Sequence, residues 1–193
     1  MASKTVFMPH SEYPYVKEID GYRNPKAIEG LDVLEISTRS KDPFGKSMSP
    51  FNLEIRLKSG KRAKVECLYQ GSKVIEGGLH YPNLYWGSPR DAALFGPTKG
   101  KRAVAFKFFN REMPLNPKHA FFNWLYICSL CQRKDNVFEK LDKFDGFSDI
   151  FYSPRKDPNC QARAASIYIS LIREGLISED TPSQEILDVL VGE

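Results

Sequence analysis

The hydrophobic pattern of this chain changes its period at Val65, and this change restricts the possible folds more than any other feature of the sequence. Polar and apolar residues alternate over residues 52–57, which is the pattern of a half-buried strand. Ser59-Gly60 predicts a turn, and residues 63–65 can pair back on the first strand as a hairpin. From Val65 to Ile75 the apolar residues recur at helical spacing. A strand pair that leads directly into a helix indicates an α+β fold.

The rest of the chain predicts more helix than strand. We expect strands at residues 31–38 and 103–109, an extended segment at 146–152 and a turn-rich loop at 41–50. We expect further helices that begin at Ser88-Pro89 or cover residues 117–132, 136–141, 160–174 and 182–190. The predicted architecture is a helix-dominated α+β single domain at residues 31–193 with a small antiparallel sheet, preceded by a loop-rich N-terminal lead-in at residues 1–30.

The composition is that of an ordinary globular protein. Of the 193 residues, 41% are hydrophobic and 27% are charged, so the chain can bury a core without additional crosslinks. The sequence contains no apolar run of about 18 residues, and residues 1–10 lack the apolar core of an export signal. We therefore expect a cytoplasmic protein with no membrane span. The net charge of +4 permits a phosphate-bearing ligand but does not by itself predict nucleic-acid binding.

The cysteines are expected to be free thiols in a reducing compartment, because no export signal accompanies them. Cys128 and Cys131 form one C-x-x-C pair, but the sequence has no second pair, and this one lies inside a predicted helix. A structural zinc ion needs a full set of tetrahedral ligands. We therefore expect no metal site, and nothing in the sequence indicates a cofactor.

One edge of the predicted helix at residues 65–75 is rich in chemically active side chains. At about 100° per residue, Glu66, Gln70 and Lys73 lie within a stripe of about 60°, and Tyr69 flanks them. A helix fixes the spacing of such groups, which suits a catalytic site. The alternative is the solvated polar face of a surface helix, and the pattern alone favours that alternative.

A second candidate segment covers residues 147–163. It places Asp149, Arg155 and Lys156 ahead of a predicted helix that starts near Asn159, with Arg163 in the first turn. Helix N-termini bind phosphate through free N–H groups and the helix dipole. In the alternative interpretation Asn159 only caps the helix and the basic residues lie on the surface.

A third candidate is the loop at residues 44–52. Phe44 and Phe51 offer rings that can stack on a base or an adenine, and Lys46 adds a positive charge. Most loops of this composition are turns packed on the core, so this alternative also stays open.

Taken in this order, the three segments resemble the NADAR family, which has a YbiA-like fold and is named for a proposed link to NAD and ADP-ribose. Residues 65–73 are similar to the hallmark helix of the family. Residues 49–52 resemble its short Ser/Phe/Asn loop, and residues 159–163 resemble its closing Asn/Arg-bearing helix. The positions that match the hallmark are Glu66, Tyr69, Gln70 and Lys73.

The resemblance runs from about residue 34 to residue 174. Residues 65–78 and 149–165 are most similar to the NADAR antitoxins encoded beside a DarT-type toxin, which ADP-ribosylates guanine in DNA. The chain departs from the family at residues 152–158, where a Gly-Lys-rich segment is replaced by Tyr-Ser-Pro-Arg-Lys-Asp-Pro. The resemblance therefore leaves open which residues hold the diphosphate.

The resemblance implies an N-glycosidase that cleaves the bond between ribose C1 and a base nitrogen and so removes ADP-ribose from guanine in DNA, in a single strand or flipped from a duplex. In this role Glu66 is the general acid and base, and Lys73 either forms a Schiff base with the opened ribose or holds substrate oxygens. Asp149 is expected at the ribose hydroxyls and Arg163 at the diphosphate. The implied substrate-binding residues are Tyr69, Gln70, Phe51, Asn52, Trp86, Asp149, Arg163, Gln161 and Asn159, with Phe51 or Trp86 stacked on a base.

The implied partners are ADP-ribosylated DNA, ADP-ribose and a cognate DarT-type toxin, with no membrane partner. Two alternatives stay open at this point. The first is an N-glycosidase that acts on a small ribosylated metabolite, as other family members do on riboflavin-pathway intermediates. The second is a non-catalytic module that binds ADP-ribose, or an antitoxin that blocks its toxin by direct contact.

Overall fold

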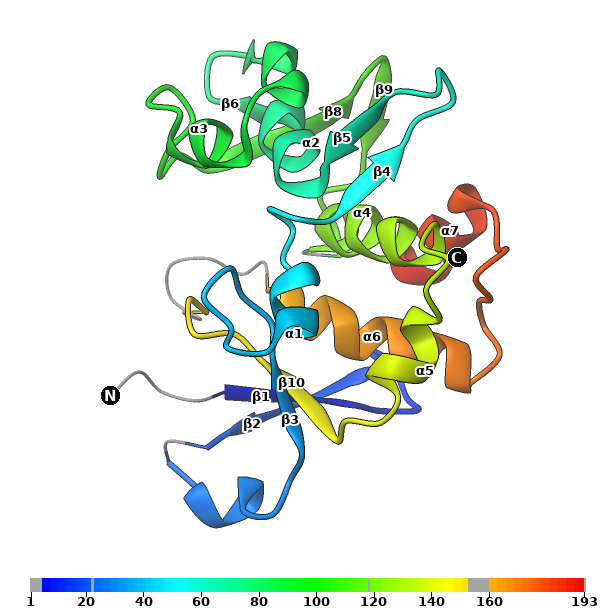
Figure 1. The fold of residues 1–193 in the computed structure, drawn as a ribbon. Coiled ribbons are helices and arrows are strands. Elements are labelled where there is room, and N and C mark those ends of the chain that lie inside the picture. Colours follow the sequence, from blue (N-terminus) through cyan, green and yellow to red (C-terminus); the bar gives the residue numbers. More distant parts are fainter. Residues whose placement is uncertain (1–4, 22, 118, 153–159, 193) are drawn as a thin grey trace.

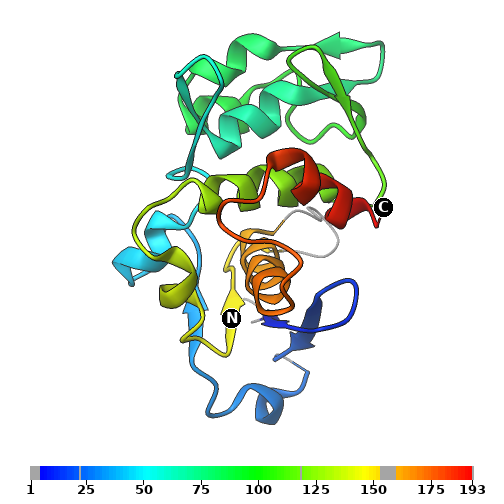
Figure 2. The same ribbon diagram turned by 90° about the vertical axis from the view of Figure 1, so that its right-hand side faces the viewer.

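The computed structural model describes residues 5–21, 23–117, 119–152 and 160–192, and its α+β fold is built around helix α4 (Ala120–Cys131). Figure 1 shows α4 between a sheet at the bottom and a group of short helices and strands at the top. Figure 2, turned by 90°, shows α7 (Ser183–Val191) beside α4 and α6 (Gln161–Arg173) beneath it. None of the described helices is long and apolar enough to cross a membrane. The predicted α+β class is confirmed.

The lower sheet joins the start of the chain to its second half, with strand order β2-β1-β10-β3. Strand β1 pairs antiparallel with β2 and with β10, whereas β10 and β3 are parallel. The sequence led us to expect an antiparallel sheet, and the parallel pair of β10 and β3 departs from that expectation. The four strands are β1 (Thr5–Pro9), β2 (Val16–Asp20), β3 (Val33–Glu35) and β10 (Gly146–Ser148).

The N-terminal residues contribute two strands to this sheet, and the prediction of a loop-rich segment was wrong for residues 5–9 and 16–20. Only Val6 and Phe7 of β1 are apolar and fully buried, and a pair of residues is too short to show a hydrophobic period. The domain boundary that we placed at residue 31 stays a prediction.

The upper group contains the hairpin and the helix with which the sequence analysis began. Strands β4 (Glu54–Arg56) and β5 (Arg62–Lys64) pair antiparallel, and α2 (Val65–Ser72) follows directly. This part of the prediction is confirmed. A second antiparallel sheet has the order β7-β6-β8-β9 and consists of β6 (Lys73–Ile75), β7 (Leu79–His80), β8 (Ala103–Phe108) and β9 (Arg111–Met113). The short helices are η1 (Pro25–Ile28), α1 (Pro43–Ser47), η2 (Pro82–Trp86), α3 (Pro89–Leu94) and α5 (Val137–Leu141).

Helix α2 is shorter than predicted, because the chain leaves it at Ser72 and continues as β6. Lys73 has an extended backbone with φ −64° and ψ 128°, and it pairs with Phe106 of β8. The β-branched side chains of Val74 and Ile75 favour a strand wherever a neighbouring strand offers backbone partners. Lys73 therefore lies one residue beyond the helix and not on its edge.

The predicted turn-rich loop at residues 41–50 contains the short helix α1. Asp42 caps it, since its Oδ1 accepts hydrogen bonds from the N–H groups of Phe44 at 2.7 Å and Gly45 at 3.3 Å. A Cβ at Gly45 would collide with the carbonyl oxygen of Glu35. The absence of a side chain at Gly45 thus allows α1 to lie directly against the end of β3.

The predicted start of α3 and the predicted end of α6 are confirmed. Ser88 caps α3, because its Oγ accepts a hydrogen bond from the N–H of Asp91 at 3.1 Å. Gly175 follows α6 with a left-handed φ of +67°. Helix α4 is buried at every position from Ala120 to Leu130, which explains why its apolar residues show no one-sided pattern.

Candidate active site

The loop at residues 49–53 is attached to the first turn of α2. The N–H of Glu66 donates to the carbonyl of Pro50 at 3.0 Å, and the N–H of Val65 donates to that of Leu53 at 3.1 Å. Such first-turn N–H groups have no partner inside their own helix, so nearby carbonyls satisfy them. Two of the three candidate segments, the loop and the helix edge, therefore lie side by side.

Glu66 and Gln70 form a polar pair one helical turn apart, in which Glu66 is buried and Gln70 is half-buried. Glu66 is only 8% exposed, and the Nε2 of Gln70 donates a hydrogen bond to the Oε1 of Glu66 at 2.8 Å. A carboxyl group removed from water needs hydrogen-bond donors of this kind. The amide consequently fixes the direction of one carboxylate oxygen, and the pair is not the solvated helix face of the alternative interpretation.

The ring of Tyr69 links α2 to the lysine that follows the helix. Tyr69 is 6% exposed and packs on Phe106 and Phe122, with ring centroids 5.5 and 5.3 Å away. The Nζ of Lys73 lies 4.7 Å from the centroid of the Tyr69 ring, within the range of a cation–π interaction. The amine of Lys73 thus returns to α2 although its backbone belongs to β6.

A second group of predicted residues lies at the end of β10. Asp149 is 7% exposed, and its Oδ1 accepts a hydrogen bond from the N–H of Phe151 at 2.8 Å. The Sγ of Cys160 donates to Oδ2 at 3.9 Å. Burial, with the charge of Asp149 beside it, raises the pKa of Cys160 far above its usual value. Cys160 is therefore a neutral thiol that can donate to the carboxylate.

The start of α6 is fixed against β3 and carries a partly buried cation. The Nε2 of Gln161 donates to the carbonyl of Ile36 at 3.1 Å. Burial lowers the pKa of Arg163. A guanidinium stays protonated even so, and a half-buried one attracts anions strongly. The predicted residues Arg155, Lys156 and Asn159 lie outside the described residues.

Aromatic rings of α4 connect these two groups. Phe122 contacts Tyr69 and stacks on Tyr126 with a centroid distance of 6.2 Å. Tyr126 is fully buried, its hydroxyl donates to the carbonyl of Met48 at 2.8 Å, and burial raises its pKa. The negative charge of Asp149 acts in the same direction on this phenol. A row of rings therefore runs from Lys73 to the neighbourhood of Asp149.

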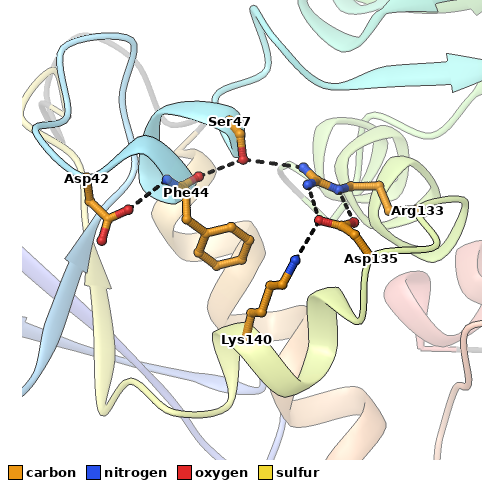
Figure 3. Close-up of polar contacts among 6 residues, drawn as sticks. All are labelled: Asp42, Phe44, Ser47, Arg133, Asp135 and Lys140. Atoms are coloured by element: carbon orange, nitrogen blue, oxygen red, sulfur yellow. Dashed lines mark hydrogen bonds and ion pairs between the residues drawn. The ribbon is translucent and has the colours of Figure 1, made fainter.

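Figure 3 shows the polar network that supports the other end of the loop at residues 44–52. Arg133, just after α4, donates from Nε to Asp135 at 2.8 Å and from Nη1 to the Oγ of Ser47 at 3.5 Å. The Nζ of Lys140 lies 3.0 Å from Asp135 and 5.7 Å from the centre of the Phe44 ring. These contacts hold α1 against the segment between α4 and α5, so the loop that follows α1 is fixed at both ends.

A match to a known protein family covers almost the whole chain, including the residues around Glu66 and those around Asp149. Residues 22–191 match the family of DarT1-associated NADAR antitoxins. The chain belongs to this family. The resemblance that we inferred from residues 34–174 is thereby confirmed. No curated protein is similar enough to supply an individual relative.

In this NADAR antitoxin the loop residues Phe51 and Asn52 have different exposures. Phe51 is half-buried and Asn52 is exposed. The Nδ2 of Asn52 donates to the carbonyl of Lys46 at 2.8 Å, and its own carbonyl accepts from the Nζ of Lys64 at 3.0 Å. Asn52 therefore stabilises the shape of the loop beside Glu66.

Trp86 is not brought together with the other predicted residues of the NADAR site. It belongs to η2, which packs on α2 where a Cβ at Gly71 would lie 2.5 Å from the ring of Tyr85. Gly71 points about 140° away from Glu66 around the helix. Trp86 thus lies on the opposite side of α2, and its expected place against the substrate's base is not supported by this position.

A hollow of about 970 Å³ beside the hairpin was not foreseen from the sequence. It is lined by residues from segments 52–62, 129–136 and 179–180. Of the predicted site residues that the structure describes, it includes Asn52 alone. No local motif signals such a hollow, because its walls come from parts of the chain that are far apart in sequence.

The C-x-x-C pair has the properties of structural thiols, with Cys128 buried and Cys131 half-buried. Cys128 and Cys131 are both free, and burial raises the pKa of Cys131 to about 12. Within the described ranges, no three His, Cys, Asp or Glu side chains are grouped as a metal site requires. The side chains of the described site offer a carboxyl group, an amine, a guanidinium and hydroxyl-bearing rings.

Proposed function

We propose that this NADAR antitoxin is an N-glycosidase that removes ADP-ribose from guanine in DNA and so reverses the action of a cognate DarT-type toxin. The observation that carries the proposal is the buried carboxyl group of Glu66, held by Gln70 and followed along the chain by an amine on the face of Tyr69. The family membership supports the same reaction, since the family as a whole is linked to N-glycoside hydrolysis.

Glu66 has the general acid and base role in this proposal. Cleavage of the bond between ribose C1 and the guanine nitrogen leaves an electron pair on the nitrogen, which takes the proton of the Glu66 carboxyl group. Water then adds to C1 and gives a proton back to the carboxylate, which restores the starting state. The proposal needs the carboxyl group of Glu66, which is 8% exposed, to carry a proton before the bond breaks, because only the protonated form can act as the acid.

Lys73 is the second essential group. In one form of the proposal its neutral amine adds to C1 of the ring-opened ribose, guanine leaves with the proton from Glu66, and water hydrolyses the resulting Schiff base. In the other form the amine stays a cation and holds the substrate's oxygens. Borohydride reduction during turnover distinguishes the two, since only the Schiff base is reduced to a stable amine that leaves the ADP-ribose group on Lys73. Asp149 is proposed at the ribose hydroxyls and Arg163 at the diphosphate.

Turnover of an oligonucleotide that carries ADP-ribosyl-guanine tests the proposal. We expect wild-type protein to restore guanine, and Glu66→Gln to lower kcat by about 10²-fold or more with KM little changed. Glu76→Gln is a matched control, because Glu76 is an exposed carboxylate in the turn after β6. A Glu66→Gln variant with wild-type kcat would remove the acid and base role. Faster turnover of a free ribosylated nucleotide than of DNA would assign the site to small metabolites instead.

A further inference from the structure

A hollow of about 530 Å³ with exposed aromatic walls lies on the four-stranded sheet β7-β6-β8-β9, here called the upper sheet. Trp86 is 50% exposed and Phe109 is 38% exposed, which is unusual for such large rings when they lie together. Their centroids are 6.4 Å apart. The lining residues on which the inference depends are His80, Asn83, Tyr85, Trp86, Lys107 and Phe109.

This hollow and the candidate active site are on opposite faces of the same sheet. Side chains alternate between the two faces of a strand. Phe106 faces Tyr69, as its pairing partner Lys73 does, so Lys107 faces the other way. His80 pairs with Val74, which faces away from Lys73, so His80 lies on the same face as Lys107. The hollow is thus separate from the site around Glu66.

The rings of the hollow are held in place by the hydroxyl of Tyr85. This hydroxyl donates to the carbonyl of Lys107 at 3.0 Å, accepts from the N–H of Phe109 at 3.1 Å and lies 3.1 Å from the Oγ of Ser72. Phe109 has a φ of +53°, a left-handed conformation that bulky residues rarely adopt. Strained positions of this kind concentrate at functional sites. The aromatic surface is therefore rigid and not a product of loose packing.

The charges and polar groups around the rings indicate the ligand. Among the described lining residues none is acidic, Lys107 supplies one cation, and the Nζ of Lys61 lies 5.0 Å from the centre of the Trp86 ring. Asn83 supplies an amide that can bond to a base edge. Within the described chain the Nε2 of His80, which lines the hollow, is buried without a hydrogen-bond partner and is available to a polar group of a ligand.

We propose that this hollow is a binding subsite for an unpaired nucleobase of single-stranded DNA, which stacks on Trp86 and Phe109 while Lys61 and Lys107 attract the neighbouring phosphates. Aromatic platforms combined with cations are the usual means of holding single strands without sequence preference. In the context of the proposed function, on which this inference rests, the base belongs to the strand that carries the modified guanine but lies away from it.

Binding of an unmodified, labelled oligothymidylate of about ten nucleotides to the full chain at low salt tests the inference by fluorescence anisotropy. We expect Trp86→Ala to weaken binding about 5- to 100-fold, which is the usual contribution of one stacked base, and Trp86→Phe to weaken it less. Leu176→Ala is the matched control, because Leu176 is a 42% exposed apolar residue outside the hollow, and it should bind as wild type does. Circular dichroism verifies that each variant is folded.

Equal affinities of wild type and Trp86→Ala would overturn the inference, as would the absence of any binding by wild-type protein. If Trp86→Ala bound the oligonucleotide as wild type does but no longer bound the toxin, the hollow would belong to a protein partner and the inference would be overturned as well. The test is independent of turnover, because the unmodified strand has no bond to hydrolyse. Failure of Glu66→Gln to lose activity would thus refute the proposed function without affecting this result.

Discussion

Replacing Gly71 with alanine tests how α2 is held against η2. The added Cβ would lie 2.5 Å from Cδ1 and 2.7 Å from Cε1 of Tyr85. The ring cannot move freely, since its hydroxyl contacts Ser72, Lys107 and Phe109. Overpacking costs about 1–3 kcal/mol, and each hydrogen bond lost by a displaced ring adds about 1 kcal/mol. Alanine recovers about 1 kcal/mol relative to glycine inside a helix. We therefore expect a net loss of about 1–3 kcal/mol in the free energy of unfolding.

Urea denaturation followed by circular dichroism measures this loss, and thermal melting should show a Tm lower by about 3–10 °C for a chain of this length. The background variant Tyr85→Ala provides the control, because it removes the ring that the new methyl group would strike. In that background Gly71→Ala should raise the free energy of unfolding by up to about 1 kcal/mol. A Gly71→Ala protein that is as stable as wild type, or more stable, would refute the assigned contact.

Two further predictions concern single polar contacts. Gln70→Leu removes the donor that orients Glu66, so we expect kcat on the modified oligonucleotide to fall about 10- to 100-fold. Gln184→Leu removes a similar side-chain bond on the exposed face of α7 and should keep wild-type kcat. Equal losses in both variants would point to general destabilisation. The hydrogen bond from Arg133 lowers the pKa of Asp135 well below its usual value, so the stabilisation exists above the unfolded pKa of about 4 and is lost as the pH falls through the folded pKa. Because this pair is partly exposed, we expect Asp135→Asn to cost less than about 1 kcal/mol at pH 7 and the difference from wild type to shrink towards pH 2 in urea denaturation. A difference that does not change with pH would contradict this reasoning.

The parts of the fold that the sequence predicted well have their signals within a few neighbouring residues. The β4–β5 hairpin follows from strict alternation around Ser59-Gly60, and the start of α3 follows from a side chain that caps its own helix at Ser88. The end of α2 could not be found in this way. Lys73 is compatible with a helix when its neighbours alone are considered, and only the pairing with Phe106, more than thirty residues later, moves it into a strand.

The same difference applies to the candidate site. Glu66 and Gln70 were expected to be neighbours because an interval of four residues makes one helical turn, and the structure brings them together. Trp86 could not be placed from the sequence, because its side of α2 depends on the packing of Tyr85 against Gly71. The hollows beside the hairpin and on the back of the upper sheet are equally invisible to local patterns, since their walls come from distant segments.

The junction between α2 and β6 has a consequence for the seven-residue interval that separates the acid from the amine. The interval is two helical turns closed by the first position of a strand, and a strand changes face at every residue. Inserting one residue after Ser72 would therefore exchange the faces, so that the lysine would join Trp86 on the reverse of the sheet while Glu66 stayed where it is. The seven-residue spacing therefore depends on both the turns of α2 and the alternating faces of β6. No side-chain rotation can compensate for the insertion of one residue between them.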